Sequence, residues 1–420
     1  MRIRHLLLAI VALAVAPISA SRAQQTEIVI YHYQTDKRHE ALKQVFRRFE
    51  AENADVKIVD IFKPDQTITS DVQAALAARR PVDIATIAGR NVYFMSRTTA
   101  AVPINQDAGK AAFLDNYLPQ FLDVGRRGDQ VFAMPYAFGT PMLYYNKDVF
   151  RKAGLDPEAP PKTWDEVISA AKTIQDKTGV AGVAHLAAGN KDYGTMLMVT
   201  NAGGTYLNAE GDKLMFDSAE GIAGLQLWQD LVIKHKVLPI ANDAQWTAAF
   251  LGGRLAMYVT SSAGLRQVVQ QSQGKFELGV ANYPLFPGRS ARKVPNSGAT
   301  FMLYAPAGPR RDASLKFLAF MSRLEIANYW SRESGYMPLM KDPLRDADMK
   351  KYVDEFAYVR PVLAQMPDTV STYVWAEKGA LEAQSIVSKL IDDLWAGKGP
   401  ASELVPVAVR QGNAALAKTN

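Results

Sequence analysis

Residues 135–164, PYAFGTPMLYYNKDVFRKAGLDPEAPPKTW, decide how the rest of the chain is organised. The apolar and aromatic run from Met142 to Tyr145 lies between Pro141 and Asn146, which predicts a short strand. An amphipathic segment follows, and three closely spaced prolines then hold an extended linker. The stretch therefore predicts a strand, a short helix and a stiff connection to the next helix.

Two sequence spacings predict where later helices begin. Thr163 and Glu166 have the S/T-x-x-E spacing of a capping box, in which each side chain accepts a backbone N–H of the first turn. Ser322 and Glu325 repeat this spacing farther along the chain. We expect one helix to start at each pair.

The composition indicates a globular chain of about two domains. It has 420 residues, of which 48% are hydrophobic and 21% are charged. The absence of cysteine excludes disulfides, thiolate metal sites, cysteine nucleophiles and an N-terminal lipid anchor on cysteine. Lysine and arginine are interspersed with acidic residues and form no basic run, so nucleic-acid binding is not expected.

The first 23 residues have the pattern of a secretory signal. Arg2 and Arg4 form a positive start, and residues 6–16 form an apolar segment too short to cross a bilayer. Small side chains at Ser21 and Ala23 fit the positions that a signal peptidase recognises. We expect cleavage before Gln24 and export to the periplasm as a protein without a lipid anchor.

After this segment, continuous apolar strands alternate with helices. The predicted strands cover residues 28–33, 56–62 and 82–87, which favours a parallel sheet with helices on both faces. Ligands of such sheets gather at the carboxyl ends of the strands. The loops at these ends contain Tyr33-Gln34, Asp65-Gln66 and Gly89-Arg90-Asn91.

The second part of the chain repeats this alternation. A strand at 255–259 leads to the hydroxyl-rich run Thr260-Ser261-Ser262, and a strand at 299–304 follows Ser297-Gly298. The Pro/Gly-rich run at 284–288 is interpreted as a crossing back to the first domain. Two helices, at 381–395 and 402–417, are predicted to close the chain.

Three ordered blocks of sequence resemble the bacterial extracellular solute-binding proteins of family 1, the receptors of ABC importers for sugars and related solutes. The blocks are YYNKD, AGLDP and PPKTWDE within 144–166, FLGGRLAMYVTSS at 250–262, and FLAFMSRLEIANYWSRESGYMP at 317–338. Within the family, the chain is most similar to the glycerol-3-phosphate-binding branch. The resemblance covers most of residues 24–420.

The resemblance implies an α/β fold with two lobes, the type II fold of periplasmic binding proteins. Each lobe is expected to hold a mainly parallel sheet flanked by helices. The N-terminal lobe would comprise 24–136 and 282–331, and the C-terminal lobe 140–280 and 336–420. The solute would bind in the cleft between the lobes, and the closed monomer would deliver it to a membrane permease whose ATPase is a separate subunit.

A sugar or polyol site needs aromatic faces for C–H groups and polar groups for hydroxyls. The candidates at loops or element ends are Tyr33, Gln66, Arg90, Asn91, Phe138, Gly139, Tyr193, Ser261, Ser262, Ser297, Gly298, Tyr336 and Trp375. Most of these positions carry over from the glycerol-3-phosphate-binding branch, including Tyr336 in its GY-x-P motif. Near Trp375, however, the branch has an arginine that grips phosphate, and this chain has none, so Arg90 is the alternative anion-binding group.

The residues favour binding over catalysis. The five histidines are scattered without an H-E-x-x-H motif, and no G-x-S-x-G turn or P-loop is present. We therefore expect neither enzyme activity nor a cofactor. Two alternatives remain: a secreted glycan hydrolase, which would release products, and a binding protein that presents its closed form to a chemoreceptor.

Overall fold

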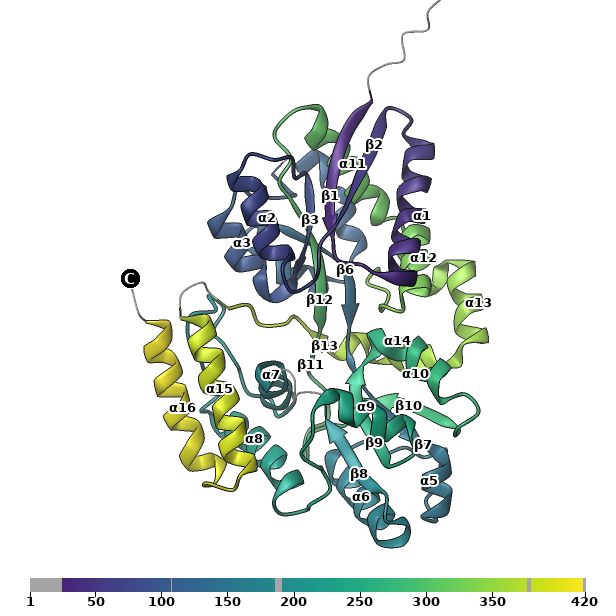
Figure 1. The fold of residues 1–420 in the computed structure, drawn as a ribbon, viewed down its shortest axis with the longest axis vertical. Helices are drawn as coiled ribbons and strands as arrows, with labels where there is room; N and C mark the ends of the chain where they lie inside the picture. The colour runs from purple at the N-terminus through teal and green to yellow at the C-terminus, as the bar shows by residue number, and fades with distance from the viewer. Residues whose placement is uncertain (1–24, 107, 186–190, 376–378, 418–420) are drawn as a thin grey trace, which may run out of the picture.

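The protein consists of two halves, each built on its own sheet and stacked along the long axis of the molecule (Figure 1). The computed structural model describes residues 25–106, 108–185, 191–375 and 379–417. The expected signal segment and cleavage site lie outside these residues. The two-lobed α/β fold expected from the resemblance is confirmed.

The first sheet has the strand order β2-β1-β3-β12-β6. Strands β2 and β3 pair parallel to β1, whereas β12 runs antiparallel to both β3 and β6. The bounds are β1 (Thr26–His32), β2 (Val56–Phe62), β3 (Ile84–Ala88), β6 (Ala133–Gly139) and β12 (Ser297–Leu303). The odd direction of β12 follows from topology, because this strand enters the sheet from the other half.

The second sheet has the order β10-β7-β9-β8. Strand β7 runs antiparallel to both its neighbours, and β8 is parallel to β9. The bounds are β7 (Pro141–Asn146), β8 (Ala181–His185), β9 (Leu255–Ser261) and β10 (Leu278–Asn282). Short pairs join β11 (Val294–Pro295) to β13 (Thr369–Val370) and β4 (Arg126–Arg127) to β5 (Gln130–Val131).

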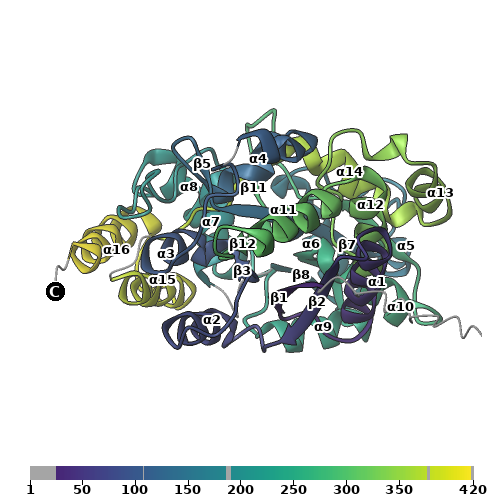
Figure 2. The ribbon, with the colours of Figure 1, turned by 90° about the horizontal axis from the view of Figure 1, so that it is seen from above.

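Helices cover both faces of the first sheet, because its strands are apolar on both faces. Alternate residues of β1 contribute to two separate apolar cores: Ile28 and Ile30 to one, Tyr31 to the other. Figure 2 shows α2 and α3 on one side of this sheet and α11 on the other. The helices are α1 (Asp36–Glu52), α2 (Ile68–Ala77), α3 (Val92–Thr98), α4 (Pro119–Leu122), α5 (Lys147–Lys152), α6 (Trp164–Thr178), α7 (Lys191–Asn201), α8 (Ala219–Val232), α9 (Asp243–Leu251), α10 (Leu265–Ser272), α11 (Pro309–Met321), α12 (Leu324–Ser334), α13 (Ala347–Glu355), α14 (Arg360–Gln365), α15 (Ala380–Trp395) and α16 (Ala401–Leu416).

The first passage between the halves is almost direct. Strand β6 ends at Gly139 and β7 begins at Pro141, so Thr140 alone separates the two sheets. Its backbone N–H donates to the Oγ of Ser262 at 3.0 Å, and its Oγ1 accepts from Gln365 at 2.8 Å. Both partners are buried, so the crossing is fixed by hydrogen bonds in the interior.

The return passage lies later than the Pro/Gly-rich run predicted for it. Leu285 exchanges backbone hydrogen bonds with the segment that starts α6, and Arg289 donates to the carbonyl of Ala202. Residues 284–288 therefore form a loop on the second half, and the chain joins the first sheet only at Ser297. Prolines and glycines predict a loop but carry no information about the surface on which it packs.

The third passage is also later than expected. Leu118 donates to the carbonyl of Leu339, and Lys341 donates to the carbonyl of Asn116. The side chain of Asn328 in α12 donates to the carbonyl of Pro343. The segment after Gly335 thus remains on the first half, and α14 is the element that packs on β10.

One of the two predicted capping boxes is confirmed. The Thr163 hydroxyl accepts from the N–H of Glu166, whose carboxylate accepts from the N–H of Thr163. The prediction at Ser322 is wrong: α12 has Arg323 at its N-cap without a side-chain cap. The Ser322 hydroxyl instead donates to the carbonyl of Ala319 in the preceding helix.

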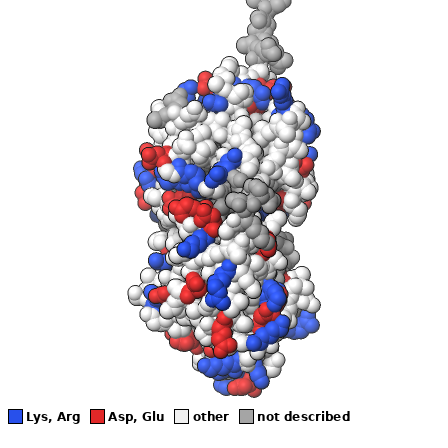
Figure 3. All heavy atoms as spheres, turned by 90° about the vertical axis from the view of Figure 1, so that its left-hand side faces the viewer, with Lys and Arg blue, Asp and Glu red and all other residues white. Residues whose placement is uncertain are grey.

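Two further features of the structure are the distribution of surface charge and the character of the helices. Figure 3 shows positive and negative side chains interspersed over one face of both halves. Within the described residues, no helix has the length and apolar character needed to cross a membrane.

We predict that Asp83→Ala destabilises the first half. Asp83 is fully buried, and its Oδ2 accepts from the N–H of Val29 at 2.7 Å and from Arg310 at 2.5 Å. Loss of a charged acceptor for two donors should lower the free energy of unfolding by about 2–3 kcal/mol, measured by urea denaturation. The control is Asp312→Ala, whose exposed pair with Lys110 should contribute less than about 1 kcal/mol. Equal losses in both variants would contradict the prediction.

Candidate functional site

The carboxyl ends of β1, β2 and β3 all face the second half (Figure 1). Tyr33 follows β1, Asp65 follows β2, and Arg90 follows β3. Burial raises the pKa of Tyr33 well above its usual value, the neighbouring Tyr136, Tyr336 and Asp65 add to the rise, and the charge of Arg90 opposes it. The three loops therefore bring an aromatic ring, a carboxylate and a guanidinium within range of one another.

The second half contributes a carboxylate to the same region. Asp192 lies at the start of α7, where its Oδ2 accepts from Nε1 of Trp375 at 3.1 Å and its Oδ1 accepts from the hydroxyl of Tyr206. Burial raises the pKa of Asp192, while these hydrogen bonds and the charge of Arg90 act against the rise. Arg90 thus acts electrostatically on groups of both halves.

Tyr336, from the GY-x-P motif, is fixed by a residue of α1. The guanidinium of Arg38 lies 4.5 Å from the centre of the Tyr336 ring, and its Nη1 donates to the Tyr336 hydroxyl at 3.3 Å. Arg38 also donates to the carbonyl of Ser334 at 3.0 Å and to that of Ala263 at 2.7 Å. Because Ala263 follows β9, this one side chain joins the two halves.

The serine and glycine candidates lie at the crossings, where backbones approach closely. A Cβ on Gly139 would lie 2.6 Å from Oγ of Ser261, and a Cβ on Gly298 would lie 2.1 Å from the carbonyl oxygen of Ala137. Ser297 is exposed, whereas Ser262 is buried, with its hydroxyl bound to the crossing at Thr140. Of these residues, Ser261, Ser297 and Gly298 retain some exposed surface.

Two aromatic candidates are buried in the core. Phe138 is fully buried and its ring packs near that of Phe121. Tyr193 is 9% exposed and its hydroxyl donates to the carbonyl of Pro295 at 2.6 Å. Both side chains face the core in this conformation, and their contact with a solute stays a prediction.

Two polar candidates remain at the rim of the first half. Gln66 is exposed in the loop after β2. Asn91 is partly buried and donates to the hydroxyl of Thr69 at 3.2 Å. Both lie in the same loops as Asp65 and Arg90, although no contact joins them to Trp375 or Tyr336 in the described structure.

Sequence reasoning missed Asp192 and Arg38. Asp192 directly precedes the candidate Tyr193, and the helical turn directs the acid toward Trp375 and Tyr206 while the tyrosine packs in the core. Arg38 lies in an ordinary charged run, DKRHE, with no local feature that distinguishes it. Only the long-range contacts of each residue show its place in the site.

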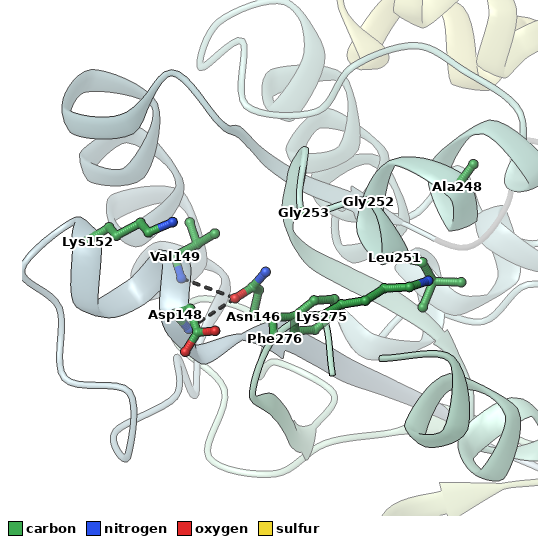
Figure 4. A pocket seen from close by; sticks show the side chains of 10 residues that line it. All are labelled: Asn146, Asp148, Val149, Lys152, Ala248, Leu251, Gly252, Gly253, Lys275 and Phe276. Atoms are coloured by element: carbon green, nitrogen blue, oxygen red, sulfur yellow. Dashed lines mark hydrogen bonds between the residues drawn. The ribbon is translucent and has the colours of Figure 1, made fainter. Parts of the chain in front are cut away.

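The large cavities elsewhere in the described structure contain none of these residues. One, of about 640 Å³, lies at the far end of the second half between α5, α9 and the segment before β10 (Figure 4). There the side chain of Asn146 accepts two N–H groups at the start of α5, and Lys152 and Lys275 flank the opening. A second cavity, of about 780 Å³, has a mainly apolar lining formed by residues 118–120, 340–345 and 363–367.

The region between the sheets therefore combines aromatic faces, the carboxylates of Asp65 and Asp192 and the guanidinium groups of Arg90 and Arg38, supplied by both halves. The carboxylates can accept hydrogen bonds from hydroxyls, guanidinium N–H groups can donate to them, and the aromatic faces can cover C–H surfaces. A separate group, formed by His32, His39 and Asp60, has its ligand atoms within 4.8 Å of one another on the first half.

Comparison with known sequences places this arrangement in a family. The profile of the bacterial extracellular solute-binding proteins matches residues 35–326. The chain is 25% identical over 424 residues to the sn-glycerol-3-phosphate-binding periplasmic protein UgpB of Brucella abortus, with 95% of each chain covered. It is 24% identical to UgpB of Pectobacterium atrosepticum, with 96% of this chain and 94% of the relative covered.

Solved structures share the fold. The cyclic α-maltosyl-1,6-maltose binding protein of Arthrobacter globiformis matches with a TM-score of 0.84 and 23% identity, covering 93% of this chain and 99% of that one. UgpB of Mycobacterium tuberculosis, solved with glycerophosphocholine, matches with a TM-score of 0.78 and 20% identity, covering 93% and 98%. With the profile matching well over half of its length, the chain belongs to the bacterial extracellular solute-binding proteins.

Proposed function

We propose that the chain is the substrate-binding protein of an ABC importer and binds a carbohydrate or a glycerol-phosphate-like solute between its halves. The observation that carries this proposal is the convergence of Arg90 and Tyr33 from one half with Asp192 and Trp375 from the other. Relatives named for glycerol 3-phosphate support a glycerol-phosphate-like solute, and structural neighbours named for maltose derivatives support a carbohydrate.

The charges at this place favour an uncharged, polyhydroxylated solute over a phosphate. A phosphate would need Arg90, but the carboxylate of Asp192 already lies within range of that guanidinium, and Asp65 places a second carboxylate near Tyr33. A sugar hydroxyl can donate to a carboxylate and accept from the guanidinium at once. Its C–H surface can lie against Trp375 or Tyr336.

The two lobes act as bodies that close on the solute. The expected division was 24–136 with 282–331 and 140–280 with 336–420. The contacts of residues 284–295 and 336–346 support later boundaries, near Ser297 for the return and near α14 for the third passage. Because the solute contacts both lobes only when they approach, binding favours the closed form.

The chain works in the periplasm after cleavage before Gln24. In the closed form, the monomer docks on the permease at the inner membrane and releases its solute there. The proposal includes no cofactor and no catalytic step. Steady release of smaller sugars from an oligosaccharide would favour the glycan hydrolase instead.

The proposal predicts compaction on binding. A thermal-shift screen of saccharides, polyols and glycerophosphodiesters first selects a compound that stabilises the mature protein. Saturation with that compound should reduce the radius of gyration in solution scattering, while helix content by circular dichroism stays constant. An unchanged radius with a stoichiometrically bound compound would exclude closure by lobe rotation.

The class of solute is tested at Arg90. We expect Arg90→Ala to weaken a neutral saccharide by less than about tenfold in calorimetry, because other groups hold most of its hydroxyls. If the natural solute is a phosphate, the loss should be about one to two powers of ten. The control is Arg80→Ala, which removes an exposed arginine at the opposite end of β3. Tight binding of glycerol 3-phosphate that is lost in Arg90→Ala alone would overturn the preference for a neutral solute.

Arg38 should contribute to affinity without belonging to the solute's contacts. Arg38→Lys keeps the charge, but a single ammonium cannot reach Ser334, Ala263 and Tyr336 together. We expect a loss of about tenfold in affinity for the screened compound. Arg48→Lys is the matched control, because Arg48 also lies in α1 and over a tyrosine ring, that of Tyr329, at 4.0 Å. Similar affinities for the two variants would contradict a role for Arg38 in joining the lobes.

A further inference from the structure

A carboxylate at the start of α7 is held in place by two buried donors from other segments of the chain. Asp192 accepts from Nε1 of Trp375 at 3.1 Å with one oxygen and from the hydroxyl of Tyr206 with the other. Tyr206 is fully buried, Trp375 is 4% exposed, and the two rings meet edge to face with their centres 5.8 Å apart. The carboxylate therefore cannot turn away without breaking a hydrogen bond to a buried group.

The two donors require an acceptor at both oxygens of Asp192. An indole N–H can only donate, and burial raises the pKa of Tyr206 well above its usual value, so the Tyr206 hydroxyl keeps its proton. An ionised carboxylate satisfies both partners, and hydrogen bonds of this charge-assisted kind are about twice as strong as neutral ones. These contacts favour the ionised form of Asp192 and act against the effect of its burial.

The neighbouring cation in the same helix does not neutralise this charge. Nζ of Lys191 donates to Oδ1 of Asp392 in α15 at 2.5 Å and lies 6.0 Å from the centre of the Trp395 ring. Arg90, by contrast, is exposed on the first half and acts electrostatically on Asp192. The charge of Asp192 is therefore left to act on Arg90 and on a solute beside it.

We propose that Asp192 is a specificity-determining residue of the solute site, which rejects phosphorylated solutes by a charge that Tyr206 and Trp375 hold in place. The inference rests on the proposed function, because that function puts the solute between Arg90 and Asp192. A sugar hydroxyl donates to the carboxylate, whereas a phosphate dianion has no proton to donate and is repelled. Because the carboxylate is held by two donors, a change of rotamer cannot relieve this repulsion.

The substitution Asp192→Asn separates the charge from the geometry. The amide oxygen can still accept from Nε1 of Trp375, and the amide nitrogen can donate to the hydroxyl oxygen of Tyr206. The hydrogen-bonded arrangement is thus kept, while the negative charge near Arg90 is removed.

We expect Asp192→Asn to bind glycerol 3-phosphate at least about tenfold more tightly than the wild type does, because like charges no longer meet in the cleft. Affinity for a neutral saccharide selected by thermal shift should instead fall by about tenfold, since a neutral acceptor replaces a charged one. Calorimetry with both compounds measures these two changes, which have opposite signs. Adding Arg90→Ala to Asp192→Asn should cancel the gain, because the guanidinium is the group that holds the phosphate.

The positioning is tested without solute, so that its failure is distinguishable from failure of the proposed function. The indole N–H of Trp375, identified by its loss in Trp375→Phe, should exchange slowly with solvent both in the wild type and in Asp192→Asn. Asp192→Ala should accelerate this exchange by about tenfold or more, because the indole loses its acceptor. Equal exchange in the wild type and Asp192→Ala would contradict the positioning.

The matched control is Asp176→Asn, which removes the same formal charge from the exposed face of α6 in the same half. Its affinities for both compounds should equal those of the wild type. Asp192→Ser removes the charge with a shorter side chain and serves if Asp192→Asn does not fold. A loss of glycerol 3-phosphate affinity, no detectable gain, or an equal gain in Asp176→Asn would each overturn the proposal. If no screened compound binds the wild type, the proposed function fails, while indole exchange still decides the positioning.

Discussion

The buried amide of Gln365, which follows the third passage, is hydrogen-bonded to the first passage and to Tyr283 after the second sheet. Its Nε2 donates to Oγ1 of Thr140 and to the carbonyl of Pro141, each at 2.8 Å, and its Oε1 accepts from the N–H of Tyr283 at 2.6 Å. Each broken bond would leave a buried group unsatisfied, at a cost of about 1–3 kcal/mol. A rotation of the lobes is therefore expected to keep these bonds and to bend the chain beside them.

Close approach of neighbouring backbone and side-chain atoms explains the glycines at the crossings. Gly139 and Gly298 resemble ligand-binding positions of the family, yet each is also required by its surroundings, because a Cβ there would meet Ser261 or the backbone of Ala137. Their presence in a family pattern thus has a structural cause that is independent of the solute. Because glycine has no side chain, these two positions also leave room for a solute to approach the crossings.

Local features of the fold could be predicted from the sequence, whereas the long-range features of the site could not. The strand at 142–145 and the capping box at Thr163 depend on neighbouring residues, and both are present. Ser322 failed as a cap because its hydroxyl is bound within the preceding turn. The buried ring of Phe138 and the missed Asp192 have one reason: which side of an element faces the other half depends on packing, and no spacing in the sequence records it.

Charges placed on opposite lobes provide a physical reason for closure to require a solute. At a separation of 4 Å, two unit charges of opposite sign attract by about 4 kcal/mol at an effective dielectric constant of 20. Removing each ion from water costs several kcal/mol. Arg90 and Asp192 brought together alone would therefore gain little from closing. A polyhydroxylated solute between them replaces the lost water with hydrogen bonds to both groups, so the same charges that gain little in the empty closed form favour the occupied one.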